Sequence, residues 1–347
     1  MSAPLYAVVL AGGVGSRFWP LSTPERPKQL LPLITDHSML AETVERLVPL
    51  VGLERVLILT SERLRDPILA ALPGLTASQL LLEPRPAGTA AALTWAASQV
   101  VARGGSYARM LCVHADWAIK DPERFRETLA RSAEVAASRA ALATVGIVPS
   151  RPDPGFGYIQ PGEPLGDGAR AVARFVEKPD RARAAQMVAD GFLWNSGIFA
   201  WRAQDLLDEV RAVTPELAGA LAHVGEGAAA FFGAVATSVS IDVGVLERSQ
   251  RVIVLPGDFG WDDVGTWSAL QRVRAHDADG NANHGRVVTR DANGNVVHAE
   301  GSAVVLYGVR DLVVVVRDGV TLVTTVDRAT DLKTLVEGLP ADLRDLR

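Results

Sequence analysis

The stretch "AVVLAGGVGSRFWP", Ala7 to Pro20, decides the fold class of the chain. A run of Val and Leu ends abruptly at two glycines, as a buried strand does where it enters a turn. A glycine turn after a first strand commonly places backbone N–H groups around a phosphate. Two well-known versions do not fit this one. No Gly-Lys pair follows, as the P-loop requires, and Phe18 stands where a dinucleotide fingerprint needs its third glycine.

Two cations accompany the glycine loop. Arg17 lies within it, and Lys28 stands between Pro27 and Gln29. A guanidinium presents a fixed fork of N–H donors to phosphate oxygens. An arginine and a lysine beside a glycine loop can therefore bracket a polyphosphate. On these residues alone, the loop could also be an ordinary strand-to-helix turn and Lys28 a solvated surface charge.

Composition excludes several classes of protein. The 347 residues are 48% hydrophobic and 22% charged, which is typical of a globular chain with room for one large and one small domain. The net charge of −5 gives no basic footprint for nucleic acid. Cys112 is the one cysteine, and no apolar stretch is long enough to span a membrane. We therefore expect a cytoplasmic protein without nucleic-acid or membrane partners.

Strands alternate with helices along the first half of the chain, which predicts right-handed βαβ units and a mostly parallel sheet. The predicted strands are Leu5–Leu10, Arg55–Leu59, Arg109–Val113 and Ala141–Val148, and the predicted helices are Ser38–Val48, Thr89–Ala102 and Pro122–Arg139. A segment dense in Pro and Gly, 150–169, is expected to be a loop or a hairpin. Later strands are predicted at Val172–Phe175, Gly197–Trp201 and Val252–Leu255, and a helix at Ala203–Val213.

The last part of the chain has a different pattern. A polar, glycine-bearing segment from His276 onward is interpreted as an interdomain linker. Short apolar runs beyond it, with turns at Asn293-Gly294 and Asp318-Gly319, predict a small β domain closed by a helix at Leu332–Glu337. The predicted domains are residues 1–275 and residues 284–347.

The segment "LAGGVGSRFWPLSTPERPKQLLPL", residues 10–33, strongly resembles the signature of the sugar-1-phosphate nucleotidyltransferases. Its Trp-Pro and Pro-Lys-Gln elements are similar to those of the mannose-1-phosphate guanylyltransferase branch. The resemblance covers nearly the whole chain. It implies an α/β fold, with a Rossmann-like (GT-A-like), mostly parallel nucleotidyltransferase domain and a small C-terminal β-helix-like domain. Longer relatives add a cupin isomerase domain, which we do not expect in this chain.

The resemblance also implies where the nucleotide binds. The expected nucleotide-binding residues are Leu10, Ala11, Gly12, Gly13, Gly15, Ser16, Glu83 and Thr89. Within "LEPRPAGTAAAL", residues 82–93, Glu83 and Thr89 match the family. Ala87 and Gly88 stand where the family has Arg and Asn, which leaves open another nucleotide or another hexose 1-phosphate as substrate.

Two carboxylates match the metal positions of the family. Asp116 follows a predicted strand in "HADWAIKD", and Asp263 aligns with the second metal carboxylate in "GWDDVGTW". Mg²⁺ is usually held by one or two carboxylates together with substrate phosphates. The resemblance therefore implies Mg²⁺ on Asp116 and Asp263. Asp262 replaces the usual Ser or Asn and is the alternative ligand, an added charge beside the site, or a helix cap.

Four further segments resemble the sugar-binding elements of the family: "FGYI", "RFVEKPD", "LWNSGIF" and "VSIDVGVLE". The residues expected to bind the sugar phosphate are Gly157, Glu177, Lys178, Asn195 and Asp242.

These matches imply an enzyme that transfers GMP from GTP to mannose 1-phosphate, giving GDP-mannose and pyrophosphate. The sugar-phosphate oxygen would attack the α-phosphorus in line, with Arg17 and Lys28 as catalytic cations and no protein nucleophile. A homodimer is compatible with the resemblance. A different class is a catalytically inactive regulatory subunit that senses nucleotide sugars. Loss of either cation or of either metal carboxylate would favour that class, and all four residues are present.

Overall fold

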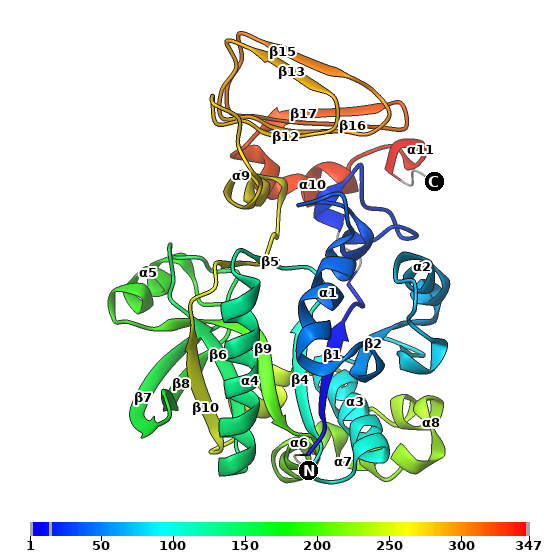
Figure 1. Ribbon diagram of the computed structural model, residues 1–347, viewed down its shortest axis with the longest axis vertical. Coiled ribbons are helices and arrows are strands. Elements are labelled where there is room, and N and C mark those ends of the chain that lie inside the picture. The colour runs from blue at the N-terminus through cyan, green and yellow to red at the C-terminus, as the bar shows by residue number, and fades with distance from the viewer. Residues whose placement is uncertain (1–2, 14–15, 345–347) are drawn as a thin grey trace.

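The computed structural model describes residues 3–13 and 16–344, so the predicted Gly15 lies outside the described residues. A large α/β part lies below a coil of short C-terminal strands (Figure 1). Within the described ranges, no helix combines the length and apolar character that crossing a membrane requires.

The large part is built on a sheet of nine described strands in the order β3-β2-β1-β4-β9-β6-β10-β8-β7. They are β1 Leu5–Leu10, β2 Val56–Ser61, β3 Leu80–Glu83, β4 Arg109–His114, β6 Leu142–Ile147, β7 Tyr158–Gly166, β8 Ala169–Val176, β9 Leu193–Arg202 and β10 Val252–Gly257. The pairs β1–β2, β2–β3, β1–β4 and β6–β10 are parallel, whereas β9 runs against β4 and β6, and β8 runs against β10 and β7. The predicted mostly parallel sheet is confirmed, with β8 and β9 as the reversed strands.

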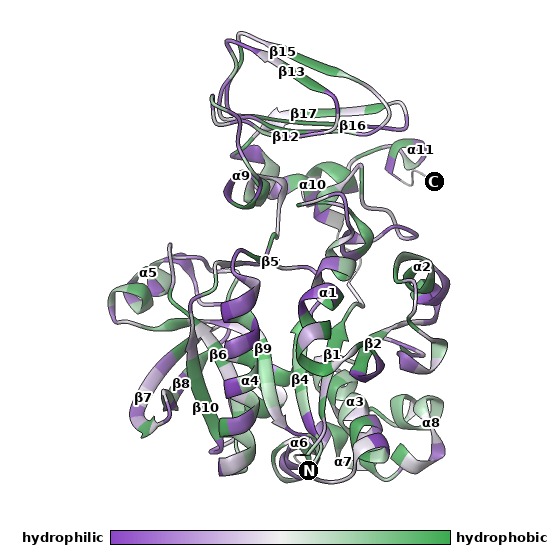
Figure 2. Ribbon diagram, in the orientation of Figure 1, coloured by the Kyte–Doolittle hydropathy of each residue, from purple (hydrophilic) through white to green (hydrophobic). Residues whose placement is uncertain are grey.

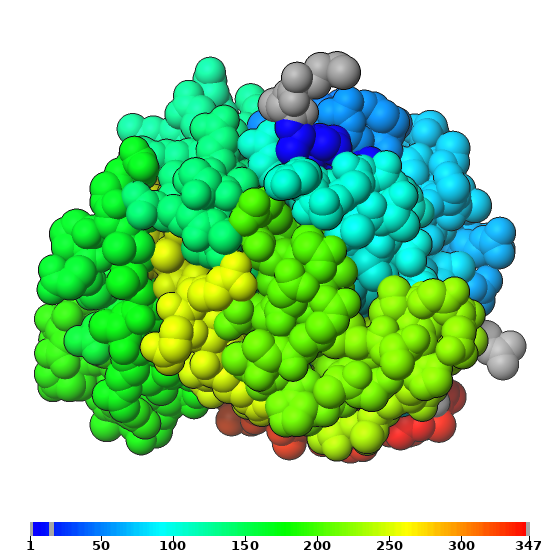
Figure 3. All heavy atoms as spheres, turned by 90° about the horizontal axis from the view of Figure 1, so that it is seen from below, coloured from blue at the N-terminus to red at the C-terminus, as the bar shows by residue number. Residues whose placement is uncertain are grey.

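Helices cover both faces of this sheet. They are α1 Met39–Val51, α2 Arg65–Ala71, α3 Thr89–Gly104, α4 Pro122–Arg139, α5 Arg181–Ala189, α6 Ala203–Val213, α7 Pro215–Leu221 and α8 Ala228–Gly233, whereas α9 Leu270–Val273 lies beneath the C-terminal coil. One apolar core packs α1 and α4 on one face, and a second packs α3 and α6 to α8 on the other. The central strands are hydrophobic along their length, whereas hydrophilic and hydrophobic residues alternate along α4 (Figure 2). From below, α3 and the α6–α8 group lie side by side (Figure 3).

Capping residues explain why some helix bounds were predictable. The side chain of Asp121 accepts a hydrogen bond from the backbone N–H of Arg124, and Pro122 occupies the first turn of α4. Proline is tolerated there because that N–H has no partner inside the helix. Ser38 caps α1 in the same way by accepting from the Ala41 N–H. The observed bounds of α4 equal the predicted ones.

The Pro- and Gly-rich segment, predicted as a loop or a hairpin, is a loop as far as residue 157 and then forms the first strand and the turn of a hairpin. Strands β7 and β8 pair antiparallel across Asp167 and Gly168. Both turn residues have positive φ, at 51° and 71°, as a tight turn matched to strand twist requires. The hairpin extends the sheet at its edge.

The C-terminal strands form a β-helix-like coil. They are β12 Ala282–His284, β13 Val287–Arg290, β14 Val296–Ala299, β15 Val304–Tyr307, β16 Leu312–Arg317 and β17 Val320–Thr325, followed by α10 Leu332–Glu337 and α11 Ala341–Arg344. One wall stacks β12, β14 and β16 in parallel and ends on the antiparallel β17, and another pairs β13 with β15. The coil has a triangular outline in Figure 1.

The predicted linker from His276 onward is shorter than expected, because β12 begins inside it at Ala282. The carboxylate of Asp277 accepts hydrogen bonds from the side-chain amides of Asn281 and Asn283. These polar residues satisfy one another in a turn, which allows the chain to enter the coil directly. Part of the segment predicted as a linker is therefore a strand, β12.

A third apolar core joins the coil to the opening loop. Phe18 and Trp267 are fully buried, and their ring centroids lie 5.2 Å apart. The indole Nε1 of Trp267 donates to the carbonyl of Trp19 at 3.1 Å. Val296 and Leu332 pack in the same core. The Phe-Trp-Pro part of the opening loop is thus a packing element under the coil.

Replacing Trp267 by Ala should therefore loosen the loop and the coil together. We expect a cost of about 3 to 5 kcal/mol, since the change opens a cavity and leaves the Trp19 carbonyl without its donor. Urea unfolding followed by circular dichroism measures the change. Trp267→Phe keeps most of the packing and serves as the matched control. A midpoint for Trp267→Ala equal to that of Trp267→Phe would contradict the assignment.

Candidate active site

The glycine loop begins from a fixed point on the sheet. Strand β1 lies between β2 and β4, and the backbone of the next residue, Ala11, is buried. The Ala11 carbonyl accepts from Gln29 Nε2 at 2.8 Å and from Thr60 Oγ1 at 3.0 Å. Gly12 and Gly13 follow and are exposed. Ser16 opens a short turn, Ser16–Phe18, that carries Arg17.

A cavity of about 580 Å³ opens beside this loop. It is lined by residues predicted to bind the nucleotide, a cation or the metal, namely Leu10, Ala11, Gly12, Gly13, Lys28, Glu83, Thr89 and Asp116. Its far wall is the segment Pro84–Gly88, where the chain departs from the family pattern. The structure thus brings these sequence-predicted residues around one space.

Glu83 is one of three acidic residues that line this cavity, with Glu62 and Asp116. It ends β3, and a Cβ placed on Gly12 would lie 3.6 Å from its Oε1. Burial raises the pKa of Glu83 to about 7. Among the described residues, none donates a hydrogen bond to this carboxylate. It is therefore available to a pair of N–H donors on a ligand.

Gly88 explains the departure from the family pattern beside Glu83. Its φ is +85°, and a Cβ built there would lie 2.3 Å from the carbonyl oxygen of Val239. No side chain fits at that separation. The neighbouring Thr89 hydroxyl accepts from the backbone N–H of Ile241 at 2.9 Å. The segment beside the nucleotide cavity is thereby attached to the segment that carries Asp242.

Two short strands bring the candidate metal carboxylates together. Strand β5, Ala118–Ile119, pairs antiparallel with β11, Trp261–Asp262. The residues just outside this ladder are Asp116 and Asp263. Segments separated by some 145 positions in the chain are therefore held side by side.

Lys28 fastens the same two segments. Its ammonium donates to the Asp116 carbonyl at 3.0 Å, to Asp116 Oδ2 at 2.8 Å and to the Asp263 carbonyl at 2.9 Å. Three acceptors match the three donors of an ammonium group. The lysine side chain is only 8% exposed. The predicted catalytic lysine thus contacts both carboxylate-bearing segments, and it also lines the nucleotide cavity.

The two carboxylates differ in charge environment. Burial is the largest influence on the pKa of Asp116 and raises it, but the charge and hydrogen bond of Lys28 and the charge of His114 together outweigh burial, so the net shift of this pKa is downward. Burial, with the neighbouring charge of Asp262, raises the pKa of Asp263 to about 6. No described residue donates a hydrogen bond to the Asp263 carboxylate. A partly buried carboxylate without a donor among the described residues suits a hard divalent cation, which prefers oxygen ligands.

Arg17 lies beside Asp263. Its Nη1 donates to the carbonyl of Gly265 at 3.3 Å. A Cβ on Gly265 would lie 2.7 Å from Asp263 Oδ2, so only glycine allows this approach. The Arg17 guanidinium and the Asp263 carboxylate therefore both lie next to Gly265.

A second cavity, of about 230 Å³, adjoins the first and shares Leu10, Thr89 and His114 with it. Its lining includes the predicted sugar residues Gly157, Glu177, Asn195 and Asp242, together with Asp263. Lys178 is largely exposed, and its Nζ contacts Glu177 Oε1 at 2.6 Å.

Hydrogen bonds fix the polar groups of this second cavity. Asn195 donates through Nδ2 to Asp242 Oδ1 at 2.8 Å and accepts at Oδ1 from the Thr144 hydroxyl at 3.0 Å. Burial and the charge of Glu177 raise the pKa of Asp242 to about 6. A Cβ on Gly157 would lie 2.6 Å from Glu177 Oε2. Close carboxylate and amide acceptors of this kind suit the hydroxyls of a sugar.

His114 was not predicted from the sequence. It ends β4 and lines both cavities, with its ring 5.0 Å from that of Trp117. Burial lowers its pKa, so the imidazole is neutral near pH 7. Its signal was its place two residues before Asp116. Phe156 and Trp261 also line the second cavity, and their signal was that they stand inside the recognised motifs.

The comparisons with known proteins agree with this geometry. Residues 6–280 match the family described as nucleotidyl transferase. The mannose-1-phosphate guanylyltransferase ManC of Salmonella typhimurium is 37% identical over 98% of this chain and 74% of its own length. The xanthan biosynthesis protein XanB of Xanthomonas campestris is 38% identical over 95% and 72%. A Thermus thermophilus structure described as a mannose-1-phosphate geranyltransferase is 36% identical, covers 96% of this chain and 98% of its own, and has a TM-score of 0.88.

Removing the Lys28 ammonium should destabilise the site. Lys28→Met leaves the partly exposed Asp116 carboxylate and two backbone carbonyls without their donor, which should cost about 1 to 3 kcal/mol. The midpoint of urea unfolding measures this change. Lys120→Met, an exposed lysine in a neighbouring cavity, is the control and should change stability by less than about 0.5 kcal/mol. Equal midpoints for the two variants would show that Lys28 does not hold these segments together.

Proposed function

The chain belongs to the nucleotidyl transferase family, and on that premise we propose that it transfers GMP from GTP to mannose 1-phosphate, giving GDP-mannose and pyrophosphate. The carrying observation is that two cavities of suitable lining adjoin at His114, with Asp116 lining the larger cavity and Asp263 the smaller one. Relatives that bear the name mannose-1-phosphate guanylyltransferase are similar along nearly the whole chain, which supports this substrate pair.

The nucleotide would lie in the larger cavity. The backbone of Gly12 and Gly13 and the guanidinium of Arg17 would hold the triphosphate, whose negative charge a guanidinium neutralises. Arg17 is well placed because it is exposed beside Asp263, and among the described residues its guanidinium donates to a single acceptor, the Gly265 carbonyl. Pyrophosphate would leave on this side.

The acceptor sugar would lie in the smaller cavity. Glu177, Asn195 and Asp242 present acceptors to its hydroxyls, and Lys178 at the rim would pair with its phosphate in exchange for Glu177. An oxygen of that phosphate then attacks the α-phosphorus in line and displaces pyrophosphate. This chemistry needs positioning and charge neutralisation rather than a protein nucleophile.

Members of the family use a divalent metal ion, and we propose Mg²⁺ held by Asp116 and Asp263. When bound, Mg²⁺ supplies charge neutralisation at the α-phosphate and orients the reacting oxygens. Lys28 contributes by holding the two carboxylate segments at a fixed separation and by keeping Asp116 ionised. This position makes Lys28 a structural tie of the site as well as a cation near the phosphates.

Guanine recognition would centre on Glu83. Guanine offers N1–H and N2–H₂ as neighbouring donors, and a carboxylate accepts both. Because Gly88 has no side chain and no room for one, the rest of the base contacts come from backbone near Leu10–Gly12. A pocket that hydrogen-bonds polar base edges rejects mismatched bases, because its buried groups would be left unpaired.

A comparison of nucleotides tests the proposed reaction. We expect GTP to give the highest kcat/KM with mannose 1-phosphate, with measurable activity for another purine triphosphate or for dTTP, since one recognition side chain is missing. The assay follows pyrophosphate release with GTP, ATP, UTP and dTTP. A higher kcat/KM for UTP or dTTP than for GTP would refute the guanylyltransferase assignment. Glucose 1-phosphate is the matched acceptor control.

The raised pKa of Glu83 predicts a pH dependence of GTP binding. The carboxylate accepts from guanine only when ionised, so affinity should rise as pH increases through about 7. Between pH 6 and pH 8 the ionised fraction grows about tenfold, and the dissociation constant should fall by a similar factor. Calorimetry across this range measures it. Glu83→Gln has no such titration, and an identical pH profile in this variant would exclude Glu83 as the acceptor.

A further inference from the structure

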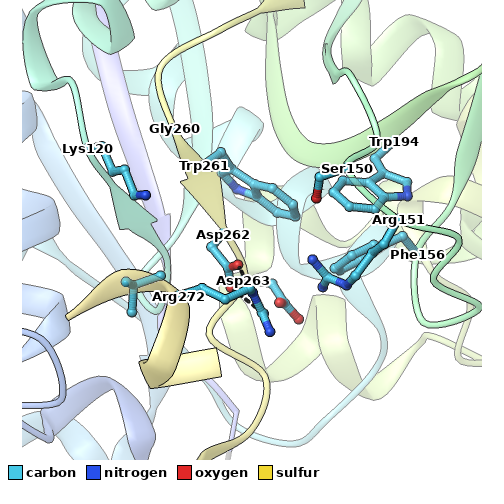
Figure 4. A pocket seen from close by; sticks show the side chains of 11 residues that line it. Lys120, Ser150, Arg151, Phe156, Trp194, Gly260, Trp261, Asp262, Asp263 and Arg272 are labelled. Carbon is cyan, nitrogen blue, oxygen red and sulfur yellow. Dashed lines mark hydrogen bonds and ion pairs between the residues drawn. The ribbon is translucent and has the colours of Figure 1, made fainter. Parts of the chain in front are cut away.

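The Asp263 carboxylate lies between two guanidinium groups. A small cavity of about 190 Å³ is lined by Asp262, Asp263, Arg151, Arg272 and Lys120. Figure 4 shows Arg272 on one side of Asp263 and Arg151 on the other, where Arg151 lies against the rings of Trp194 and Phe156. Either arginine could neutralise this carboxylate. An arginine bound there would compete with a metal ion for the same oxygens.

Each guanidinium is occupied by a different carboxylate. Arg272 donates from Nε to Asp262 Oδ2 at 2.8 Å and from Nη2 to Asp262 Oδ1 at 3.1 Å. Arg151 donates from Nε and Nη2 to Asp153 Oδ2 at 3.1 and 2.9 Å. Two-point contacts of this kind satisfy the fork of a guanidinium. Both arginines are thereby held away from Asp263.

Asp262 also accepts a hydrogen bond from the backbone. That bond needs an oxygen at this position but not a negative charge. Asp262 Oδ1 accepts from the backbone N–H of Val264 at 2.9 Å. Val264 is fully buried with φ of +47°, a conformation that a β-branched residue rarely adopts. This turn sets the direction in which Asp263 leaves the chain. An asparagine at 262 keeps an oxygen for the Val264 N–H but loses the charge that holds Arg272.

We propose that Asp262 is a positioning residue that keeps Arg272 off Asp263, so that the Asp263 carboxylate stays available to the divalent ion. The inference rests on the proposed role of Asp263 in the proposed function. The family pattern has Ser or Asn at position 262. In this chain an acidic residue is needed there because Arg272, ten positions further along, would otherwise pair with Asp263.

The physical argument is one of competing partners. Arg272 is 41% exposed on a long flexible side chain, whereas Asp262 is 13% exposed and fixed by its bond to Val264. Without the charge on Asp262, the nearest unpaired carboxylate of the cavity is Asp263. Its charge already acts on Arg272 in this structure. The arginine would then move to Asp263, and a cation would have to displace it.

The test is a double-mutant cycle on Asp262→Asn and Arg272→Gln, with Mn²⁺ alone as the probe. Binding of Mn²⁺ to the full chain without nucleotide is followed by electron paramagnetic resonance of the free ion, and the Mg²⁺ concentration for half-maximal turnover is measured in parallel. Asp262→Asn should weaken both by roughly five- to tenfold, the change expected for one competing ion pair. The double variant should return to within about threefold of the parent protein.

Two control variants distinguish the proposed role of Asp262 from a purely structural role and from a general effect of charge in the cavity. Arg272→Gln alone should bind Mn²⁺ as well as the parent or better. Lys120→Gln removes a positive charge from the same cavity and should not rescue Asp262→Asn. The inference is wrong if Asp262→Asn binds Mn²⁺ normally, if the double variant remains as weak as the single one, or if the parent binds no Mn²⁺. Rescue of Mn²⁺ binding in a protein that makes no GDP-mannose would uphold the inference and reject the proposed function.

Discussion

The ammonium group of Lys28 is the interaction on which the rest of the site depends. A buried positive charge is tolerated only where every donor has an acceptor, and here all three acceptors belong to the two segments that carry Asp116 and Asp263. The β5–β11 ladder aligns those segments, and Gln29, the next residue, holds the base of the glycine loop through the Ala11 carbonyl. One short stretch of chain therefore joins phosphate loop and carboxylates in a single arrangement.

Burial gives the two cavities a common electrical character. It raises the pKa of Glu83, Asp242 and Asp263, each an acidic group that faces a cavity with few protein donors. Carboxylates with one protein donor, as Asp242 has, or with none among the described residues, as for Glu83 and Asp263, are costly to the folded chain in a poorly solvated space. They are matched by what the proposed ligands bring, namely base N–H groups, sugar hydroxyls and a cation. Strain and cost at a functional site of this kind are expected, because the ligand supplies the missing contacts.

Regular elements were predicted well because local rules fix them. The capped helix α4 and the buried strand β1 have the predicted bounds, since their caps and apolar runs lie within a few residues. The candidate site residues could be predicted from motifs. The contacts that these residues make with one another and with the backbone could not. That the Lys28 ammonium contacts backbone carbonyls, or that Val239 leaves no room for a side chain at position 88, depends on segments distant in sequence. The start of β12 was missed for a related reason, since its polar residues pair with one another only after folding.

The packing of Phe18 and Trp19 beneath the coil bears on how the chain acquires its shape. Trp267 and Leu343 hydrogen-bond to Trp19, and Arg317 to the Leu21 carbonyl, across separations of 248 to 324 residues. Contacts between residues so far apart in sequence form slowly, because the entropy cost of closing a long loop must be met before these contacts can stabilise the fold. During synthesis the glycine loop emerges some 250 residues or more before these packing partners. Nascent chains would therefore hold a nearly finished sheet with an unpacked loop, and the loop would reach its final arrangement only once α10 and α11 had been made.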